Sequence, residues 1–141
     1  MSDQIADHIA NSCLAVRVRM LNRVITNLYD EALRPLGLKV SQLNLLVVAA
    51  KLGTARPTEV CDILLLDPST LSRNVERMQA QGWLEVVTDS DRRAQPFRIT
   101  AKGRALLKRA VPLWEQAQKQ AAELLGEQGV RLLSQIEKQL T

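Results

Sequence analysis

The sequence contains few of the residue types on which enzymes and secreted proteins depend. Its 141 residues include one His, two Cys, one Phe, one Tyr and two Trp. His8, Cys13 and Cys61 do not have the spacing of metal ligands, two cysteines make no disulfide framework, and there is no glycine-rich phosphate loop. We therefore predict a protein that is not an enzyme, with no catalytic residue, no metal and no cofactor.

Long apolar runs are also missing. The first residues, MSDQIADHIANS, contain acidic side chains and no continuous apolar segment, which argues against a signal peptide. No run approaches the roughly 20 apolar residues of a membrane span. We expect a cytoplasmic protein with reduced thiols and no membrane association.

Aliphatic residues and a small positive charge are what the chain does have. It is 46% hydrophobic but only 3% aromatic, so Leu, Val, Ile and Ala must fill the core. The net charge of +4 suits an acidic partner such as nucleic acid but is too small to identify one. The length fits one domain of common size.

The N-terminal third predicts one long helix from Gln4 to Leu33. Two neighbouring apolar rows run along it, one beginning at Ile9 and the other at Leu14. Two rows make a face too wide for a single partner, and a length of about 45 Å exceeds what a domain of this size needs. We expect this helix to contact a second subunit.

The periodicity predicts further short elements along the chain. Ser41 is the expected N-cap of a helix to Leu52, with Leu43, Leu46, Val47 and Ala50 inward. An edge strand at Thr54 to Arg56, a short helix from Pro57 or Thr58, a helix from Ala101 to Leu125 kinked at Pro112, a break at Gly126 to Gly129, and a last helix through Leu140 complete the pattern.

The central stretch predicts a capped helix followed by a hairpin. Asp67 is the expected N-cap of a helix over 68–81, with Leu71, Val75 and Met78 on its inner face. Gly82 ends this helix. Two strand-like runs follow, Trp83 to Thr88 and Pro96 to Ile99, joined by a turn over 89–95.

The polar residues of this helix are suited to reading DNA. Ser69, Thr70 and Ser72 are hydroxyl donors in its first turns, and Arg73 can grip guanine or phosphate with two parallel hydrogen bonds. Arg77 lies one turn later and suits a backbone phosphate. The helix N-terminus itself favours an anion.

The turn offers a second contact. Asp91 can bridge to Arg93, which leaves Arg92, or Arg93 itself, to project toward a narrow minor groove. Residues 56 to 104 hold eight Lys or Arg and seven Asp or Glu, so the position of the charges must carry a DNA-binding function. The alternative is a solvated helix and hairpin with ordinary surface arginines.

Three segments make the chain resemble the MarR-type family, the multiple-antibiotic-resistance regulators. DPSTLSRNVERMQAQGWLEV resembles that family's recognition helix and next strand, DRRAQPFRITAKGRALL its wing, and LRPLGLKVSQLNLL the link between its first two helices. The resemblance implies a mainly α fold with a small β-hairpin, a winged helix-turn-helix over 34–100, and dimerisation helices over 1–33 and 101–141. It implies a homodimeric repressor that binds a pseudo-palindromic site on double-stranded DNA.

The resemblance also implies release from DNA by a small ligand, of aromatic or lipophilic kind. Arg17, Met20, Val24 and Leu46 are the candidate lining residues, although apolar residues there also suit plain core. One departure from the family pattern is Leu65, which stands where a glycine is usual in the turn before the recognition helix. Leu65 must tolerate that turn or lengthen the preceding helix.

Cys13 supports an alternative, a repressor that senses oxidants. Relatives that sense organic hydroperoxides use one cysteine near the start of the first helix, but the tyrosine expected four residues on is Arg17 here. Cys13 as a small buried hydrophobe is the interpretation we favour. We expect peroxide to leave DNA affinity intact, and release by peroxide that Cys13→Ser abolishes would favour the alternative.

Overall fold

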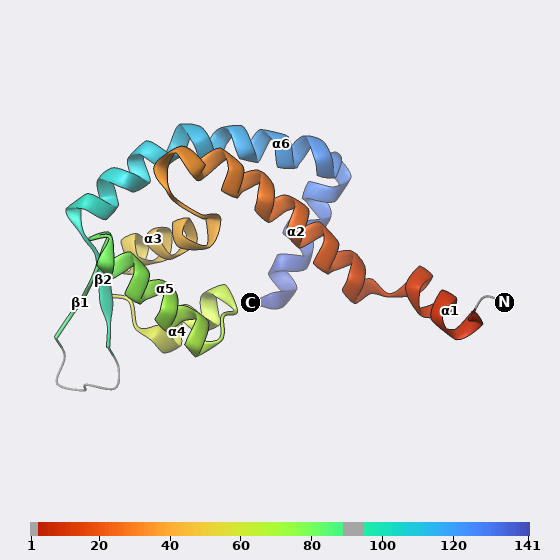
Figure 1. The fold of residues 1–141 in the computed structure, drawn as a ribbon, viewed down its shortest axis with the longest axis horizontal. Helices are drawn as coiled ribbons and strands as arrows, with labels where there is room; N and C mark the ends of the chain where they lie inside the picture. Colours follow the sequence, from red (N-terminus) through yellow and green to blue (C-terminus); the bar gives the residue numbers. More distant parts are fainter. Residues whose placement is uncertain (1–2, 89–94) are drawn as a thin grey trace.

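The computed structural model describes residues 3–88 and 95–141, and it is mainly helical with one small hairpin. Helices α2 and α6 pack side by side, and α3, α4, α5 and the hairpin lie beneath them (Figure 1). The predicted fold class is confirmed. The elements are α1 (Gln4–Ser12), α2 (Leu14–Leu33), the 3-10 helix η1 (Arg34–Leu36), α3 (Val40–Leu52), α4 (Pro57–Leu64), α5 (Pro68–Ala80), β1 (Leu84–Val86), β2 (Phe97–Ile99) and α6 (Ala101–Leu140).

Helix α3 occupies the centre of the core. It packs against α2, α6 and β2, so most of its circumference is covered. Leu45, Val48 and Ala49 are buried there, whereas Val47, which we expected to point inward, is 39% exposed. Val47 lies on the same exposed row of the helix as Asn44, which is the side that no other element covers.

The start of α3 differs from the sequence prediction. Ser41 is not the N-cap, because the helix begins one residue before it with Lys39 in the capping position. The carboxylate of Asp30, from α2, accepts a hydrogen bond from the Val40 N–H at 2.8 Å. The Gln42 side chain accepts another from the Lys39 N–H at 3.0 Å. The acceptor at Asp30 comes from another helix, so local sequence did not reveal it.

The predicted single helix from Gln4 to Leu33 is broken at Cys13. The backbone there is extended, with φ −68° and ψ 112°. The Arg17 guanidinium donates to the Asn11 carbonyl, one of the groups that the break leaves without a helical partner. Helix α1 projects away from the rest of the chain (Figure 1) and buries no residue, so nothing in one chain holds it collinear with α2.

Helix α6 runs through Pro112 and bends sharply at Gly126. Gly126 has φ 72° and ψ 168°, whereas the dihedral angles at Pro112 remain helical. The expected break is therefore confirmed, and the expected irregularity at Pro112 does not take the backbone out of the helical region. The segment after Gly126 folds back, so that Val130 and Leu133 line a hollow together with Ile25 of α2.

Across the two described ranges, no helix combines the length and the hydropathy that crossing a bilayer requires.

Candidate nucleic-acid interface

Helices α4 and α5 form a tightly turned pair around a shared apolar contact. Val60 of α4 and Leu71 and Met78 of α5 are almost fully buried. Leu65 joins the helices in the left-handed conformation, with φ 52° and ψ 49°. It therefore tolerates the turn rather than lengthening α4, at a cost of about 1–2 kcal/mol relative to a glycine's freedom there.

The N-terminus of α5 is closed by its own cap. The Asp67 carboxylate accepts hydrogen bonds from the backbone N–H groups of Ser69 and Thr70, at 3.1 and 3.3 Å. It also accepts from both hydroxyls, at 2.9 Å from Ser69 Oγ and 2.6 Å from Thr70 Oγ1. The Thr70 hydroxyl above all, and then the Ser69 hydroxyl and N–H, lower the pKa of Asp67 to about 2.

This cap changes how the first turn of α5 meets an anion. A charged carboxylate already satisfies the N–H groups that we expected to attract a phosphate. The hydroxyl hydrogens of Ser69 and Thr70 point at Asp67, so either residue must turn away from it before donating to DNA. Their role as DNA donors stays a prediction.

The outer face of α5 carries the remaining predicted contacts. Ser72, Arg73 and Arg77 are exposed, on the opposite side from the buried Leu71 and Met78. Neither arginine has an ion-pair partner within the described ranges. Because they are four residues apart, the two guanidinium groups lie one above the other on this face. They are the charged groups of the helix that an approaching duplex would meet.

The hairpin beside α5 is a short antiparallel pair. Leu84 pairs with Ile99, Glu85 with Arg98 and Val86 with Phe97, and Ala55 adds a single bridge to Phe97 in place of the expected edge strand. Asp91, Arg92 and Arg93, with the rest of residues 89–94, lie outside the described residues. The predicted bridge between Asp91 and Arg93 and the predicted minor-groove contact therefore stay predictions.

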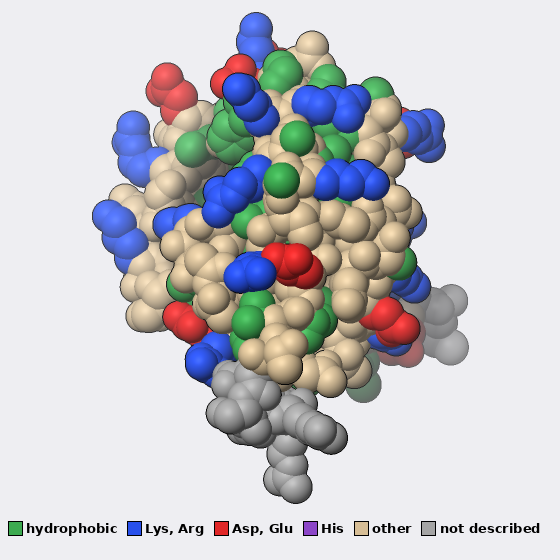
Figure 2. Space-filling model, turned by 90° about the vertical axis from the view of Figure 1, so that its left-hand side faces the viewer, with side chains coloured by type: hydrophobic (Ala, Val, Ile, Leu, Met, Phe, Trp, Pro, Cys, Tyr) green, Lys and Arg blue, Asp and Glu red, His purple; other side chains and the backbone are tan. Residues whose placement is uncertain are grey.

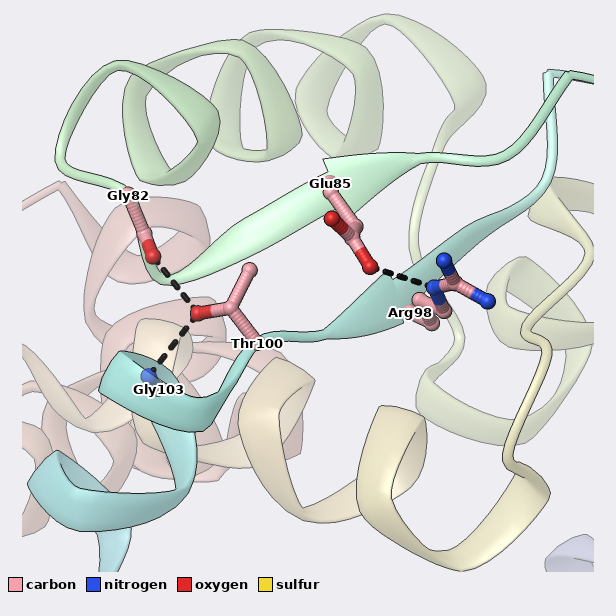
Figure 3. A network of polar contacts seen from close by, with 5 residues as sticks. All are labelled: Gly82, Glu85, Arg98, Thr100 and Gly103. Atoms are coloured by element: carbon pink, nitrogen blue, oxygen red, sulfur yellow. Dashed lines mark hydrogen bonds and ion pairs between the residues drawn. The ribbon is translucent and has the colours of Figure 1, made fainter.

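Sequence reasoning did not find the ion pair on this hairpin. Glu85 and Arg98 face each other across the two strands, and the Arg98 guanidinium donates to the Glu85 carboxylate (Figure 3). The pair depends on the register of two strands that lie 13 residues apart in the chain. Arg98, counted above among the free positive charges, is neutralised by Glu85.

A second network ties the hairpin to α6. The Thr100 hydroxyl donates to the Gly82 carbonyl at 2.6 Å and accepts from the Gly103 N–H at 3.0 Å (Figure 3). A Cβ on Gly103 would lie 2.2 Å from the Trp83 carbonyl oxygen. The sequence predicted Thr100 as a cap but gave no sign of this close approach.

Basic side chains outnumber acidic ones over the end of the molecule that carries the hairpin (Figure 2). The first turn of α6 contributes exposed Lys102 and Arg104, which follow directly on β2. We had counted both residues but assigned them no role. Their place at the hairpin base makes them further candidates for phosphate contacts.

The four residues suggested for an effector pocket are spread over different environments. Leu46 is fully buried in the core, and Met20 is 63% exposed on α2. Arg17 is bound to the Asn11 carbonyl. Val24 borders a hollow of about 500 Å³ between α2 and α6, whose lining does not include the other three side chains.

Both cysteines are free and partly buried. Cys61 packs against the edge of the main core, as expected. Cys13 lies at the break between α1 and α2, so it is not the fully buried hydrophobe that we favoured. Nothing in the structure tests its reactivity.

A helix pair with an exposed arginine row, followed by a two-stranded hairpin and carried between long terminal helices, defines a winged helix-turn-helix protein. The sequence model of the MarR family matches residues 36–94 of the chain. A transcriptional regulator of Mycobacterium tuberculosis, MOSR, solved in complex with DNA, is 32% identical, with 92% of this chain and 94% of that one covered and a TM-score of 0.80. The chain belongs to the MarR family of transcriptional regulators.

Other relatives agree with this assignment. The multiple antibiotic resistance protein MarR of Escherichia coli is 27% identical over 90 residues, and the match spans 63% of this chain and 62% of that protein's length. A mutant MarR from E. coli complexed with operator DNA has a TM-score of 0.82 at 23% identity over 99% of both chains. BpsR of Bordetella bronchiseptica, whose DNA binding is regulated by 6-hydroxynicotinic acid, has a TM-score of 0.80 at 22% identity, with 92% of this chain and 100% of that one covered.

Proposed function

We propose that the protein is a homodimeric repressor that binds a pseudo-palindromic operator on double-stranded DNA. The observation that carries this proposal is the exposed pair Arg73 and Arg77 on α5, without acidic partners in the described ranges and next to the hairpin. Helix 68–81 would lie in the major groove, with Arg73 on a base edge or phosphate and Arg77 on a phosphate. Ser72 would contact the same groove, and so would Ser69 and Thr70 once released from Asp67.

The segment 89–95 is proposed as the wing. Arg92 or Arg93 would enter the minor groove, where the negative potential is concentrated, and Asp91 would hold Arg93. The MOSR and E. coli MarR complexes with DNA support a nucleic-acid partner for this fold. Such a regulator acts where the genome lies, which for a bacterial protein is the cytoplasm, and it is not an enzyme.

The domain division follows from the same proposal. Residues 34–100 would form the DNA-binding unit, and 1–33 with 101–141 the dimerisation region. Ile5, Leu14 and Val18 are 74%, 71% and 65% exposed on the N-terminal helices, and Leu132 and Leu140 are 54% and 61% exposed on α6. A two-fold partner that covers these rows would place two α5 helices about one helical turn, roughly 10 base pairs, apart on DNA.

Release from DNA by a small aromatic or lipophilic effector is part of the proposal. Its support is the control of BpsR by 6-hydroxynicotinic acid, a small aromatic molecule, in a relative of the same fold. An effector acts by binding the DNA-incompetent arrangement more tightly than the competent one.

The test is binding to the DNA upstream of the protein's own coding sequence. Affinity for a specific site should fall by orders of magnitude between about 50 and 200 mM salt. Arg73→Ala should weaken it by about 1–3 kcal/mol, roughly ten- to a hundredfold, and Arg92→Ala should weaken it as well. Fluorescence anisotropy on a labelled duplex measures both effects.

Arg131→Ala serves as the matched control, because Arg131 is exposed on the far segment of α6. Its affinity should stay within about twofold of the parent. Equal losses for Arg73→Ala and Arg131→Ala, or weak binding to every sequence at every salt concentration, would sink the proposal.

A further inference from the structure

The inner side of α5 borders a cavity that the proposed DNA contacts do not use. It has a volume of about 700 Å³ and lies between α4, α5 and the hairpin, which are neighbours in Figure 1. Leu71 and Val75 line it from α5, and Val86 and Phe97 from the hairpin. Small-molecule sites typically measure about 300–1,000 Å³ and have mainly apolar walls. The cavity has the size and the lining of such a site.

The polar residues of the cavity give it a negative sign. Asp62 of α4 and Glu76 of α5 both line it, and none of its described lining residues is Lys, Arg or His. Within the ranges that the structure describes, neither carboxylate has a salt-bridge partner. The whole chain carries a net charge of +4, so this local excess of negative charge runs against its overall balance.

We propose that this cavity binds a lipophilic organic cation. Apolar walls from two helices and a hairpin would enclose its rings, while Asp62 and Glu76 would neutralise its charge at the rim. Thr58 and Gln79 also line the cavity and add hydrogen-bonding groups. An aromatic carboxylate or a DNA phosphate would meet two like charges at this site and is disfavoured there.

Occupancy of the cavity would reach the DNA-binding face through α5 itself. Leu71, Val75 and Glu76 line the cavity, and Arg73 and Arg77 project from the exposed side of the same helix. A cation wedged between α5 and the hairpin therefore alters the angle between the two parts that straddle DNA. This regulatory consequence rests on the proposed DNA-binding function, whereas the binding of the cation does not.

The test compares two probes of nearly equal shape and opposite charge, tetraphenylphosphonium and tetraphenylborate. Isothermal titration calorimetry of the full-length protein at about 150 mM salt, without DNA, should show saturable binding of the cation. The borate should bind more weakly or not at all. A neutral probe of similar shape, triphenylphosphine oxide, should fall between them.

Variants assign the binding to this cavity. Glu76→Gln and Asp62→Asn should each raise the dissociation constant of tetraphenylphosphonium about threefold, as for half-exposed charge pairs. Glu59→Gln is the matched control, because Glu59 lies on α4 outside the cavity lining and should leave the constant unchanged. Val86→Trp, at a lining residue that is 39% exposed, should block the site without disturbing the core.

Three results would overturn the inference. They are tighter binding of the borate, no binding of the cation up to millimolar concentration, and cation binding that Glu76→Gln and Val86→Trp leave unchanged. DNA affinity is measured first in the absence of any cation. A protein that binds DNA but not tetraphenylphosphonium refutes the cavity alone, and a protein that binds the cation but not DNA refutes the proposed function alone.

Discussion

Asp67 shows how one residue can fix both the start of a helix and the state of its neighbours. Four hydrogen-bond donors, two backbone and two hydroxyl, point at its carboxylate. They favour the charged form, so the pKa of Asp67 falls to about 2. Its contribution to stability is fully present above its ordinary value near pH 4 and is lost as the pH falls toward 2.

Removing the Thr70 hydroxyl should therefore raise the pKa of Asp67, since this is the largest single cause of its shift. Thr70→Val should move the carboxyl titration upward, toward the ordinary range, as followed by carbon NMR. Ser72→Ala is the control, because Ser72 makes no contact with Asp67, and it should leave the midpoint near 2. A midpoint near 2 in Thr70→Val would show that the hydroxyl is not the cause.

Gly103 shows that the absence of a side chain can set the distance between two elements. A methyl group there would lie 2.2 Å from the Trp83 carbonyl oxygen and 2.8 Å from Ile99 Cγ1. A glycine inside a helix ordinarily costs about 0.5–1 kcal/mol relative to alanine. The close packing of α6 against the start of the hairpin therefore outweighs the helix propensity that alanine would bring.

At the scale of elements, Gly103→Ala tests whether α6 anchors the hairpin. The backbone oxygen cannot move away as a flexible side chain would, so we expect a loss of about 1–3 kcal/mol in the free energy of unfolding. Urea denaturation followed by circular dichroism measures it. Ala105→Ser, an exposed change on the same helix, should stay within about 0.5 kcal/mol of the parent. A stabilised Gly103→Ala protein would mean that the helix tolerates the methyl group.

The helices whose signals are local were predicted well. Asp67 and Pro68 located the start of α5, and Leu71 and Met78 proved to be its buried face. The start of α3 was misplaced because its N–H acceptor, Asp30, comes from α2. Likewise, the pair between Glu85 and Arg98 exists only once the strands are in register. Local chemistry is readable in sequence, whereas partners brought together by folding are not.

At the scale of the whole molecule, the exposed apolar rows predict a dimer. The chain mass is 15.7 kDa, and light scattering should give twice that value at micromolar concentration. A stable two-fold interface buries about 1,200–2,000 Å², which the rows on α1, α2 and α6 are long enough to supply. The combined change Leu14→Glu and Leu140→Glu places charges on residues that are 71% and 61% exposed in one chain.

We expect that double variant to be monomeric and to lose operator binding. Val47→Glu is its control, because Val47 is 39% exposed on α3, outside the helices proposed to dimerise, and it should leave the dimer intact. A parent protein with the mass of a single chain would contradict the dimer. A dimeric double variant would move the interface away from the terminal helices.

The sequence by itself determined the order of elements, the aliphatic core and the arginine row of α5, because periodicity, caps and breaks act over a few residues. It also indicated the bend at Gly126, since glycine there accepts φ 72°. Only the tertiary structure decided the left-handed turn at Leu65, the closed cap at Asp67, the break at Cys13 and the cavity behind α5. Each of these depends on groups that folding places together, or on the absence of any group to hold a segment in line.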